Sequence, residues 1–179
     1  MMSSSSTTHN EETIIPIAEN IKNVKDRISK AIEVNNRPEN SVRLIAVSKT
    51  KPVELLQKAY DAGIRTFGEN YAQEVISKAP DMPSDCSFHF IGPLQSNKAA
   101  ALVKSLGLDS LKCVETVCTI KLANKLNNAV STLQEVQDDD ENEEEEVKQL
   151  GIYLQVNTSG EESKSAGLNN AQEAVDLAM

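Results

Sequence analysis

The stretch from Val42 to Pro52, VRLIAVSKTKP, constrains the fold more than any other part of the sequence. It begins with VRLIAV, a nearly unbroken apolar run, and a strand that is apolar on both faces is typical of a parallel sheet. The run ends abruptly at SKTK, and Pro52 suits the first turn of a helix. We therefore predict that Lys49 lies where a buried parallel strand leads into a helix.

The position predicted for Lys49 admits two interpretations. The carboxyl ends of parallel strands are where α/β folds bind their ligands. A desolvated lysine amine there can lose its proton and attack a carbonyl carbon to form a Schiff base. Alternatively, Lys49 is an ordinary strand-end lysine whose side chain extends into solvent. The stretch alone leaves both interpretations open.

The rest of the chain alternates strands with amphipathic helices. Periodicity and turn residues predict strands at Val42–Val47, Ile64–Phe67, Phe88–Ile91, within Leu108–Val114 and at Ile152–Val156. They predict helices at Ile14–Val34, Val53–Ala62, Tyr71–Ala79 and Lys98–Leu106, from Glu115 or Thr116 through Val130, and from Ala171 onward. Such alternation implies right-handed crossovers and a parallel sheet, which makes this an α/β protein.

Two α/β architectures compete for this pattern, an open doubly wound sheet and a TIM-type (β/α)8 barrel. No GxGxxG or GxxxxGK[ST] motif follows any predicted strand, so the nucleotide-binding forms of the open sheet lose support. A complete barrel typically needs about 250 residues. The chain of 179 residues therefore covers roughly the first five β/α units.

Charge is concentrated in one segment of the chain. The formal net charge is −9, but Asp138–Glu146 (DDDENEEEE) carries eight of the 27 acidic residues, and without it 19 acidic residues face 18 basic ones. A near-neutral folded part argues against nucleic-acid binding, which needs a basic face. We interpret Gln134–Gln149 as an acidic surface insertion, because like charges at this density resist packing.

Other compositional features exclude further classes of protein. Cys86, Cys113 and Cys118 form no CxxC pair, which fits a reducing compartment without a disulfide framework. With two histidines in the chain we expect no metal cluster. No apolar run approaches the ~18 residues of a membrane span. Residues 1–13 lack the core of a signal peptide, so we predict a disordered tail and a cytoplasmic location, with a mitochondrial pool as an alternative.

Polar residues recur at the predicted strand ends, and in a barrel these ends converge on one face. They are Lys49, Glu69, Asn70, His89, Thr116, Asn157 and Ser159. A lysine surrounded by amide, hydroxyl and imidazole groups is suited to bind a polar aldehyde. A single histidine on a strand is often only a hydrogen-bonded core residue, so the recurrence along one edge is more informative than any single member.

Four blocks in this order resemble the pyridoxal 5′-phosphate homeostasis protein family, single-domain relatives of the N-terminal barrel of alanine racemase. They are AVSKTKP (Ala46–Pro52), FGENYAQE (Phe67–Glu74), HFIGPLQSNK (His89–Lys98) and QVNTS (Gln155–Ser159), and the resemblance runs from about Ile14 to the chain end. It implies one barrel domain over residues 14–179 that holds pyridoxal phosphate through an aldimine with a lysine.

Carried over block by block, the resemblance implies that Lys49 is the aldimine lysine. Asn70, His89 and Asn157 are then the other cofactor-binding residues, and Lys51 and Lys164 match family lysines connected with cofactor exchange. The family's K-x-G motif reads here as Lys164-Ser165-Ala166-Gly167, which is one residue longer. The family takes its phosphate site from its last strands, whose sequence blocks this chain does not contain, so we expect the 179-residue chain to be incomplete at its C-terminus and to fold and bind poorly by itself.

The resemblance implies a monomeric carrier and buffer of pyridoxal phosphate, without catalytic turnover, that passes the cofactor to apoenzymes. A racemase-like enzyme or lyase is the first alternative. A two-base racemase needs a second acid or base, which alanine racemases take from a separate domain, whereas Tyr60, Tyr71 and Tyr153 all fall within predicted barrel elements. The second alternative is a fragment that does not bind the cofactor.

Overall fold

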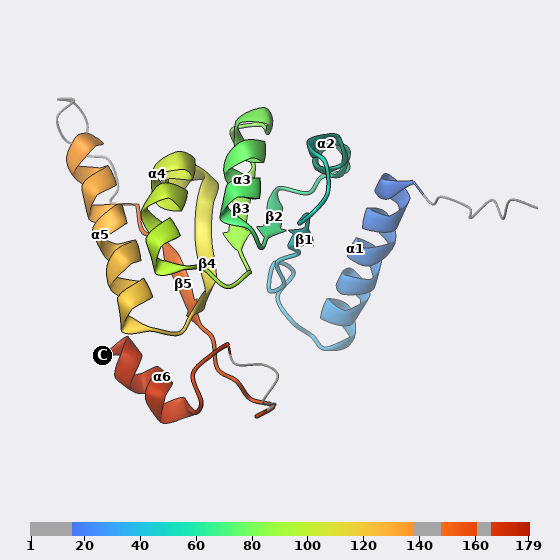
Figure 1. Ribbon diagram of the computed structural model, residues 1–179. Helices are drawn as coiled ribbons and strands as arrows, with labels where there is room; N and C mark the ends of the chain where they lie inside the picture. Colours follow the sequence, from blue (N-terminus) through green and yellow to red (C-terminus); the bar gives the residue numbers. More distant parts are fainter. Residues whose placement is uncertain (1–15, 138–147, 161–165) are drawn as a thin grey trace, which may run out of the picture. The chain divides into compact units, whose positions relative to one another are not determined.

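The computed structural model describes residues 16–137, 148–160 and 166–179 (Figure 1). The chain divides into two compact units, Met1–Val42 and Arg43–Met179. Helix α1, Ile17–Val34, belongs to the first unit. It confirms the helix that was predicted over Ile14–Val34, as far as the described residues reach. Asn35 ends the helix, and its side-chain Nδ2 donates to the carbonyl of Ala31 at 2.8 Å. The predicted tail over residues 1–13 lies outside the described residues.

The second unit alternates strands and helices, as predicted. Its strands are β1 Ala46–Val47, β2 Thr66–Glu69, β3 Ser87–Phe90, β4 Leu111–Val117 and β5 Gly151–Leu154. Its helices are α2 Val53–Asp61, α3 Ala72–Lys78, α4 Ala99–Ser110, α5 Ile120–Gln137 and α6 Ala171–Ala178, with short 3₁₀ turns at Ala79–Asp81 and Ser96–Lys98.

The order of the strands decides between the two architectures. All neighbouring strands pair in parallel, and the sheet runs β1-β2-β3-β4-β5 with no reversal (Figure 1). A doubly wound sheet reverses its order at a switch point, whereas right-handed crossovers that always add the next strand keep every helix on one face. This is the order of a barrel wall. Within the described residues the sheet is open, and β1 and β5 are its two edges.

The two faces of the sheet differ in their side chains. Phe67, Phe88 and Phe90 alternate with Gly68 and His89, and each is at most 2% exposed. The rings of Phe67 and Phe88 lie 6.2 Å apart between centroids. Since α3 contacts β2 and α4 contacts β3 and β4, this phenylalanine face is the one that the helices cover. The core continues into α4 with Leu102 and Val103, and into α2 with Leu56.

Two predicted strands differ from the structure. The first was predicted over Val42–Val47, but only Ala46 and Val47 pair with β2, and Val47 is 55% exposed. Since Val47 is exposed and Ala46 only half-buried, the prediction that this strand is buried on both faces is wrong. The fourth extends to Val117 rather than ending at Val114, so Glu115 and Thr116 are strand residues and not the start of a helix. Pairing of Val117 with Leu154 of β5 keeps this segment in the sheet, and Val117 is fully buried.

Helix α5 extends to Gln137, four residues into the segment interpreted as an acidic insertion. Residues 138–147 lie outside the described residues, so the insertion over Gln134–Gln149 and the single domain over 14–179 stay predictions. None of the helices in the described part of the chain is long and apolar enough to cross a membrane.

Candidate functional site

One register row crosses the whole sheet and defines the face opposite the helices. Val47 pairs with Gly68, Gly68 with His89, His89 with Cys113, and Cys113 with Gly151. Residues paired in this way point to the same side of a sheet. Because Phe67 and Phe88 face the helices, this row faces away from them. In a barrel wall that side is the interior, and we call it the inner face.

Lys49 is exposed and lies two residues beyond Val47, the last residue of β1. It sits in a tight turn. The amide of Ser48 donates to the carbonyl of Gly68 at 2.9 Å, and the amide of Lys51 donates to the carbonyl of Ser48 at 3.0 Å. Thr50 has a φ of 62°, in the left-handed region that a β-branched residue rarely adopts. The backbone on both sides of Lys49 is therefore in a defined conformation.

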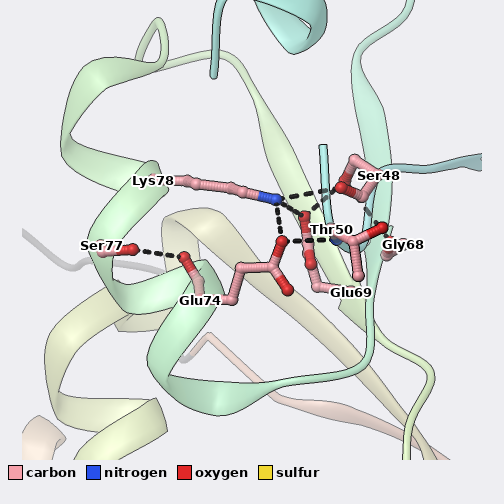
Figure 2. Close-up of polar contacts among 7 residues, drawn as sticks. All are labelled: Ser48, Thr50, Gly68, Glu69, Glu74, Ser77 and Lys78. Atoms are coloured by element: carbon pink, nitrogen blue, oxygen red, sulfur yellow. Dashed lines mark hydrogen bonds and ion pairs between the residues drawn. The ribbon is translucent and has the colours of Figure 1, made fainter. Parts of the chain in front are cut away.

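A buried network of charges surrounds this turn (Figure 2). The Lys78 ammonium of α3 donates to Glu69 Oε1 at 2.9 Å, to Glu74 Oε1 at 2.6 Å and to the carbonyl of Ser48 at 3.0 Å. The Ser48 hydroxyl donates to Glu69 Oε1 at 2.6 Å, and the amide of Thr50 donates to Glu74 Oε1 at 2.6 Å. We call Glu69, Glu74 and Lys78 the charge clamp. Glu69 is fully buried, and Lys78 is 8% exposed.

Asn70 follows β2 and is half-buried. Its Oδ1 atom is buried and has no hydrogen-bond partner among the described residues. The backbone of Gly92, after β3, packs directly against it, because a Cβ on Gly92 would lie 2.4 Å from the Asn70 carbonyl oxygen. A buried oxygen without a hydrogen bond is costly, which makes Asn70 Oδ1 a candidate acceptor for a ligand.

His89 is 2% exposed, and its Nδ1 lies 2.6 Å from Glu115 Oε1. Cys113 lies beside them, and one ligand-type atom from each of the three residues falls within 4.8 Å of the others. We expected that no metal-ligand cluster could be assembled. That expectation is wrong for the positions of the side chains, because these three residues come together from neighbouring strands. Burial, with the nearby Glu115 carboxylate, raises the pKa of the Cys113 thiol to about 11. The thiol therefore stays protonated near neutral pH, which does not favour metal binding.

Asn157 lies three residues beyond β5 and uses its side chain locally. Its Oδ1 accepts from the Ser159 hydroxyl and from the amide of Gly160, both at 3.2 Å. Its own amide donates to the carbonyl of Leu168 at 2.7 Å. The side chain thus shapes the loop after β5, and this loop is bounded by residues 161–165, which include Lys164 and lie outside the described residues.

Not every polar residue at the strand ends faces the same side. Glu69 alternates with Gly68 and turns toward α3, where it pairs with Lys78, so its predicted place in a common polar ring is wrong. The Thr116 hydroxyl donates to the carbonyl of Gly92, at 2.5 Å. Lys51 and Lys98 are exposed. Register and alternation thus put His89 and Asn70 on the inner face and Glu69 on the other face, while Lys49 lies in the turn beyond the end of β1.

Reasoning from the sequence missed Lys78, Glu74 and Glu115. Glu74 and Lys78 stand four residues apart in a predicted helix, a spacing that indicates a helical ion pair but normally a solvated one. No pattern in the sequence indicates that this pair turns inward to a strand end. Glu115 was assigned to the start of a helix, which hid that it shares a face of β4 with Cys113.

Comparison with curated proteins shows consistent relatives. The chain is 45% identical over 124 residues to the pyridoxal phosphate homeostasis protein of Schizosaccharomyces pombe, an alignment that covers 69% of this chain and 46% of the relative. It is 38% identical over 161 residues to the protein of that name from Vibrio alginolyticus, with coverages of 87% and 61%. For the Bos taurus protein the identity is 38% over 151 residues, with coverages of 80% and 50%. The chain thus spans about half the length of these relatives. No family model matches the chain.

Solved structures agree on the fold. An unknown protein from Bifidobacterium adolescentis superposes with a TM-score of 0.72 at 31% identity, covering 97% of this chain and 66% of that one. PipY of Synechococcus elongatus, solved with PLP bound, gives a TM-score of 0.64 at 30% identity, with coverages of 90% and 62%. Alanine racemase of Clostridium difficile gives 0.61 at 13% identity, with coverages of 90% and 38%, which shows the fold alone.

These likenesses confirm the predicted fold class, a parallel sheet and helices of the alanine racemase N-terminal kind that form part of a TIM-type barrel. The names of the curated relatives describe homeostasis of a cofactor and no catalysed reaction. The resemblance predicted from the four sequence blocks is therefore confirmed, and over the part that it spans this chain is a homologue of the pyridoxal phosphate homeostasis proteins.

Proposed function

We propose that this chain binds pyridoxal 5′-phosphate through Lys49 and serves in vitamin B6 homeostasis as a carrier of the cofactor. The observation that carries the proposal is the position of Lys49, an exposed lysine beyond the carboxyl end of β1, the edge of the sheet at which β2 is followed by Asn70 with its unpartnered Oδ1. The PLP-bound PipY structure, 30% identical over most of this chain, supports the choice of ligand.

The residues present fit an aldehyde of this kind. A lysine amine adds to an aldehyde carbon and releases water, which leaves a Schiff base that hides the reactive aldehyde. Asn70 offers a buried Oδ1 that lacks a hydrogen-bond partner among the described residues, and His89 offers a buried imidazole oriented by Glu115 on the inner face. We propose that Asn70 and His89 bind polar atoms of the cofactor. Asn157 was predicted as a further cofactor-binding residue, and its side chain shapes the loop after β5. We propose that it contributes to the cofactor site through this loop.

We propose a carrier rather than a racemase. A racemase of this fold needs a second acid or base opposite the lysine, and a tyrosine is the obvious candidate. The Tyr60 hydroxyl donates to Asp85 Oδ1 at 2.5 Å on the surface, which raises the pKa of Tyr60 chiefly through that hydrogen bond. Tyr71 and Tyr153 are more than half exposed. The likeness to alanine racemase concerns the fold and supports no racemase activity.

The proposal includes the predicted setting of the protein. We expect a cytoplasmic monomer whose partners are apo forms of PLP-dependent enzymes, since a Schiff base is reversible and can release the aldehyde to a second lysine. The free cysteines Cys86, Cys113 and Cys118 fit a reducing compartment.

The test is labelling of the 179-residue chain with pyridoxal phosphate, followed by borohydride reduction and peptide mapping. We expect a visible absorbance band and a reduced adduct on Lys49, and Lys49→Ala should remove both while the protein keeps its melting temperature. Lys51→Ala changes another exposed lysine of the same turn. It is the matched control and should keep the adduct on Lys49. An adduct spread over Lys51 and Lys98 with none on Lys49 would contradict the assignment.

A further inference from the structure

The turn that carries Lys49 has an unfavourable backbone conformation. Thr50 has a φ of 62°, where the Cβ of an L-residue crowds the following carbonyl oxygen and a β-branched residue is especially disfavoured. Such a conformation persists only where surrounding contacts hold it. At Thr50 that contact is the hydrogen bond of 2.6 Å from its amide to the Glu74 carboxylate, across 24 residues of sequence.

The other side of Lys49 is held from the same helix. The carbonyl of Ser48 accepts from the Lys78 ammonium at 3.0 Å, and the Ser48 hydroxyl donates to Glu69 Oε1 at 2.6 Å. Lysine has three ammonium donors, and Lys78 uses them on Ser48, Glu69 and Glu74. One buried ammonium therefore connects the residue before Lys49 with the carboxylate that holds the residue after it (Figure 2).

Stability alone does not account for this arrangement. Taking charges out of water offsets most of their mutual attraction, and apolar side chains of similar volume often stabilise a buried site as well or better. The charge clamp contains two carboxylates and one ammonium, and Glu69 Oε2 is buried without a hydrogen-bond partner among the described residues. What the charged groups supply, and apolar groups do not, is directional contact with two backbone groups of the turn.

We propose that the charge clamp of Glu69, Glu74 and Lys78 positions Lys49, by holding the turn so that the Lys49 amine, and not that of Lys51, is presented to a carbonyl ligand on the inner face. This inference rests on the function proposed above for Lys49. None of the three clamp residues contacts the ligand. Their effect is on which lysine reacts and on how well the turn is ordered.

The first variant to test is Glu74→Ala in the full 179-residue chain. Glu74 is 21% exposed, so water can replace its carboxylate, and Lys78 keeps Glu69 and Ser48 as partners. The measurements are the ratio of reduced pyridoxal phosphate adduct on Lys49 to that on Lys51, and the hydrogen exchange rate of the Thr50 amide. We expect the ratio to fall about tenfold and the exchange rate to rise about tenfold, the effect of losing one charged hydrogen bond.

Two further variants separate positioning from general destabilisation. Glu74→Gln keeps an oxygen that can accept from the Thr50 amide, so it should restore the adduct ratio of the parent to within about twofold. Gln73→Ala changes the neighbouring exposed residue of α3 and should leave both measurements unchanged. Lys78→Met leaves Glu69 buried without its ion-pair partner and is expected to unfold more readily than Lys58→Met on the exposed end of α2, so the Glu74 variants carry the test.

The outcomes distinguish this proposal from the proposed function. A parent chain with no adduct on Lys49 would overturn the function proposed for Lys49 and with it the positioning role, although amide exchange would still report whether the clamp holds the turn. Unchanged Thr50 exchange in Glu74→Ala would overturn the clamp. Faster exchange with an unchanged ratio of Lys49 to Lys51 adducts would show that the clamp orders the turn without selecting the lysine, and would also overturn the proposal.

Discussion

Gly92 and Asn70 meet backbone to backbone, because a Cβ built on Gly92 would lie 2.4 Å from the carbonyl oxygen of Asn70 and 2.6 Å from its Cα. These are main-chain atoms, which cannot turn aside as a flexible side chain can. The turns after β2 and β3 therefore fit together only with glycine at this position. Through this contact, the loop of the third strand fixes where the amide of Asn70 lies.

The close contact predicts that Gly92→Ala destabilises the protein by about 1–3 kcal/mol, the usual range for overpacking a well-packed site. Urea denaturation followed by circular dichroism measures the change. Gly107→Ala is the comparison, since nothing lies within 4 Å of a Cβ there and its φ of 65° supplies the strain alone. We expect about 1–2 kcal/mol from that conformation. An unchanged midpoint for Gly92→Ala would mean that the two turns are not in contact.

Most of the fold could be predicted because it follows from local patterns. Gly63 with its positive φ ends the segment of α2, and the strands β2 and β3 lie within one or two residues of their predicted positions. Because strands and helices alternate along the chain, a parallel sheet was predicted. The absence of phosphate-binding glycine motifs after the predicted strands favoured a barrel, and the structure has the strand order of a barrel wall. Errors fell where long-range pairing overrides local preference, as at the exposed edge strand β1 and at the end of β4.

The candidate site was predictable only in part. Lys49, Asn70 and His89 could be named because they follow or end strands, and parallel strands bring such residues to one edge. Alternation along β2 was sufficient to assign Glu69 to the opposite face from Asn70, but the sequence does not say which face the helices cover. The inward turn of Lys78 depends on the packing of α3 against two strand ends, which no local pattern records.

Two buried thiols predict a loss of stability at alkaline pH. Burial, reinforced by Asp85 beside Cys86 and by Glu115 beside Cys113, raises the pKa of both thiols from 9.0 to about 11. A raised pKa in the folded state means that the unfolded chain releases these protons first. Their contribution to stability is complete below about pH 9 and is lost as the pH rises toward 11.

The measurement is the free energy of unfolding from pH 8 to pH 11, for the parent and for a Cys86→Ala, Cys113→Ala double variant. The thiol pKa values of 9.0 in the unfolded chain and about 11 in the folded protein set this pH range. We expect the double variant to start less stable, because two buried side chains are truncated, but to lose less stability across this window. Cys118→Ala, at the half-buried third cysteine, is the control for truncating a thiol. Parallel curves for the parent and the double variant would refute the assignment.

The acidic segment predicts tolerance to deletion. Helix α5 ends at Gln137, and the side-chain Nε2 of Gln134 donates to the carbonyl of Lys148 at 2.8 Å, so the two sides of the segment already lie close together. Removing Asp138–Glu146 should therefore leave the melting temperature and adduct formation on Lys49 nearly unchanged. Loop closure contributes only about 0.6 kcal/mol for each halving of length. A large fall in melting temperature would mean that the segment packs on the core.

The open edges of the sheet predict self-association of the 179-residue chain. In the described sheet β1 and β5 each have one neighbour, and their unpaired N–H and C=O groups are a template for pairing with another chain. Both edges also expose large apolar side chains, Val47 on β1, and Ile152 and Tyr153 on β5. Apolar edges with high strand propensity favour aggregation.

Tyr153→Lys tests this expectation, since a lysine on an edge strand opposes pairing with a second chain through charge repulsion and the cost of desolvating the ammonium. Tyr71→Lys is the matched control, because Tyr71 is 56% exposed and Tyr153 57%, but Tyr71 lies outside the edge strands. Light scattering and sedimentation at increasing protein concentration should show larger particles for the parent and for Tyr71→Lys than for Tyr153→Lys. A parent chain that stays monodisperse, or a Tyr71→Lys variant that is improved as much as Tyr153→Lys, would show that the edge of β5 does not drive association.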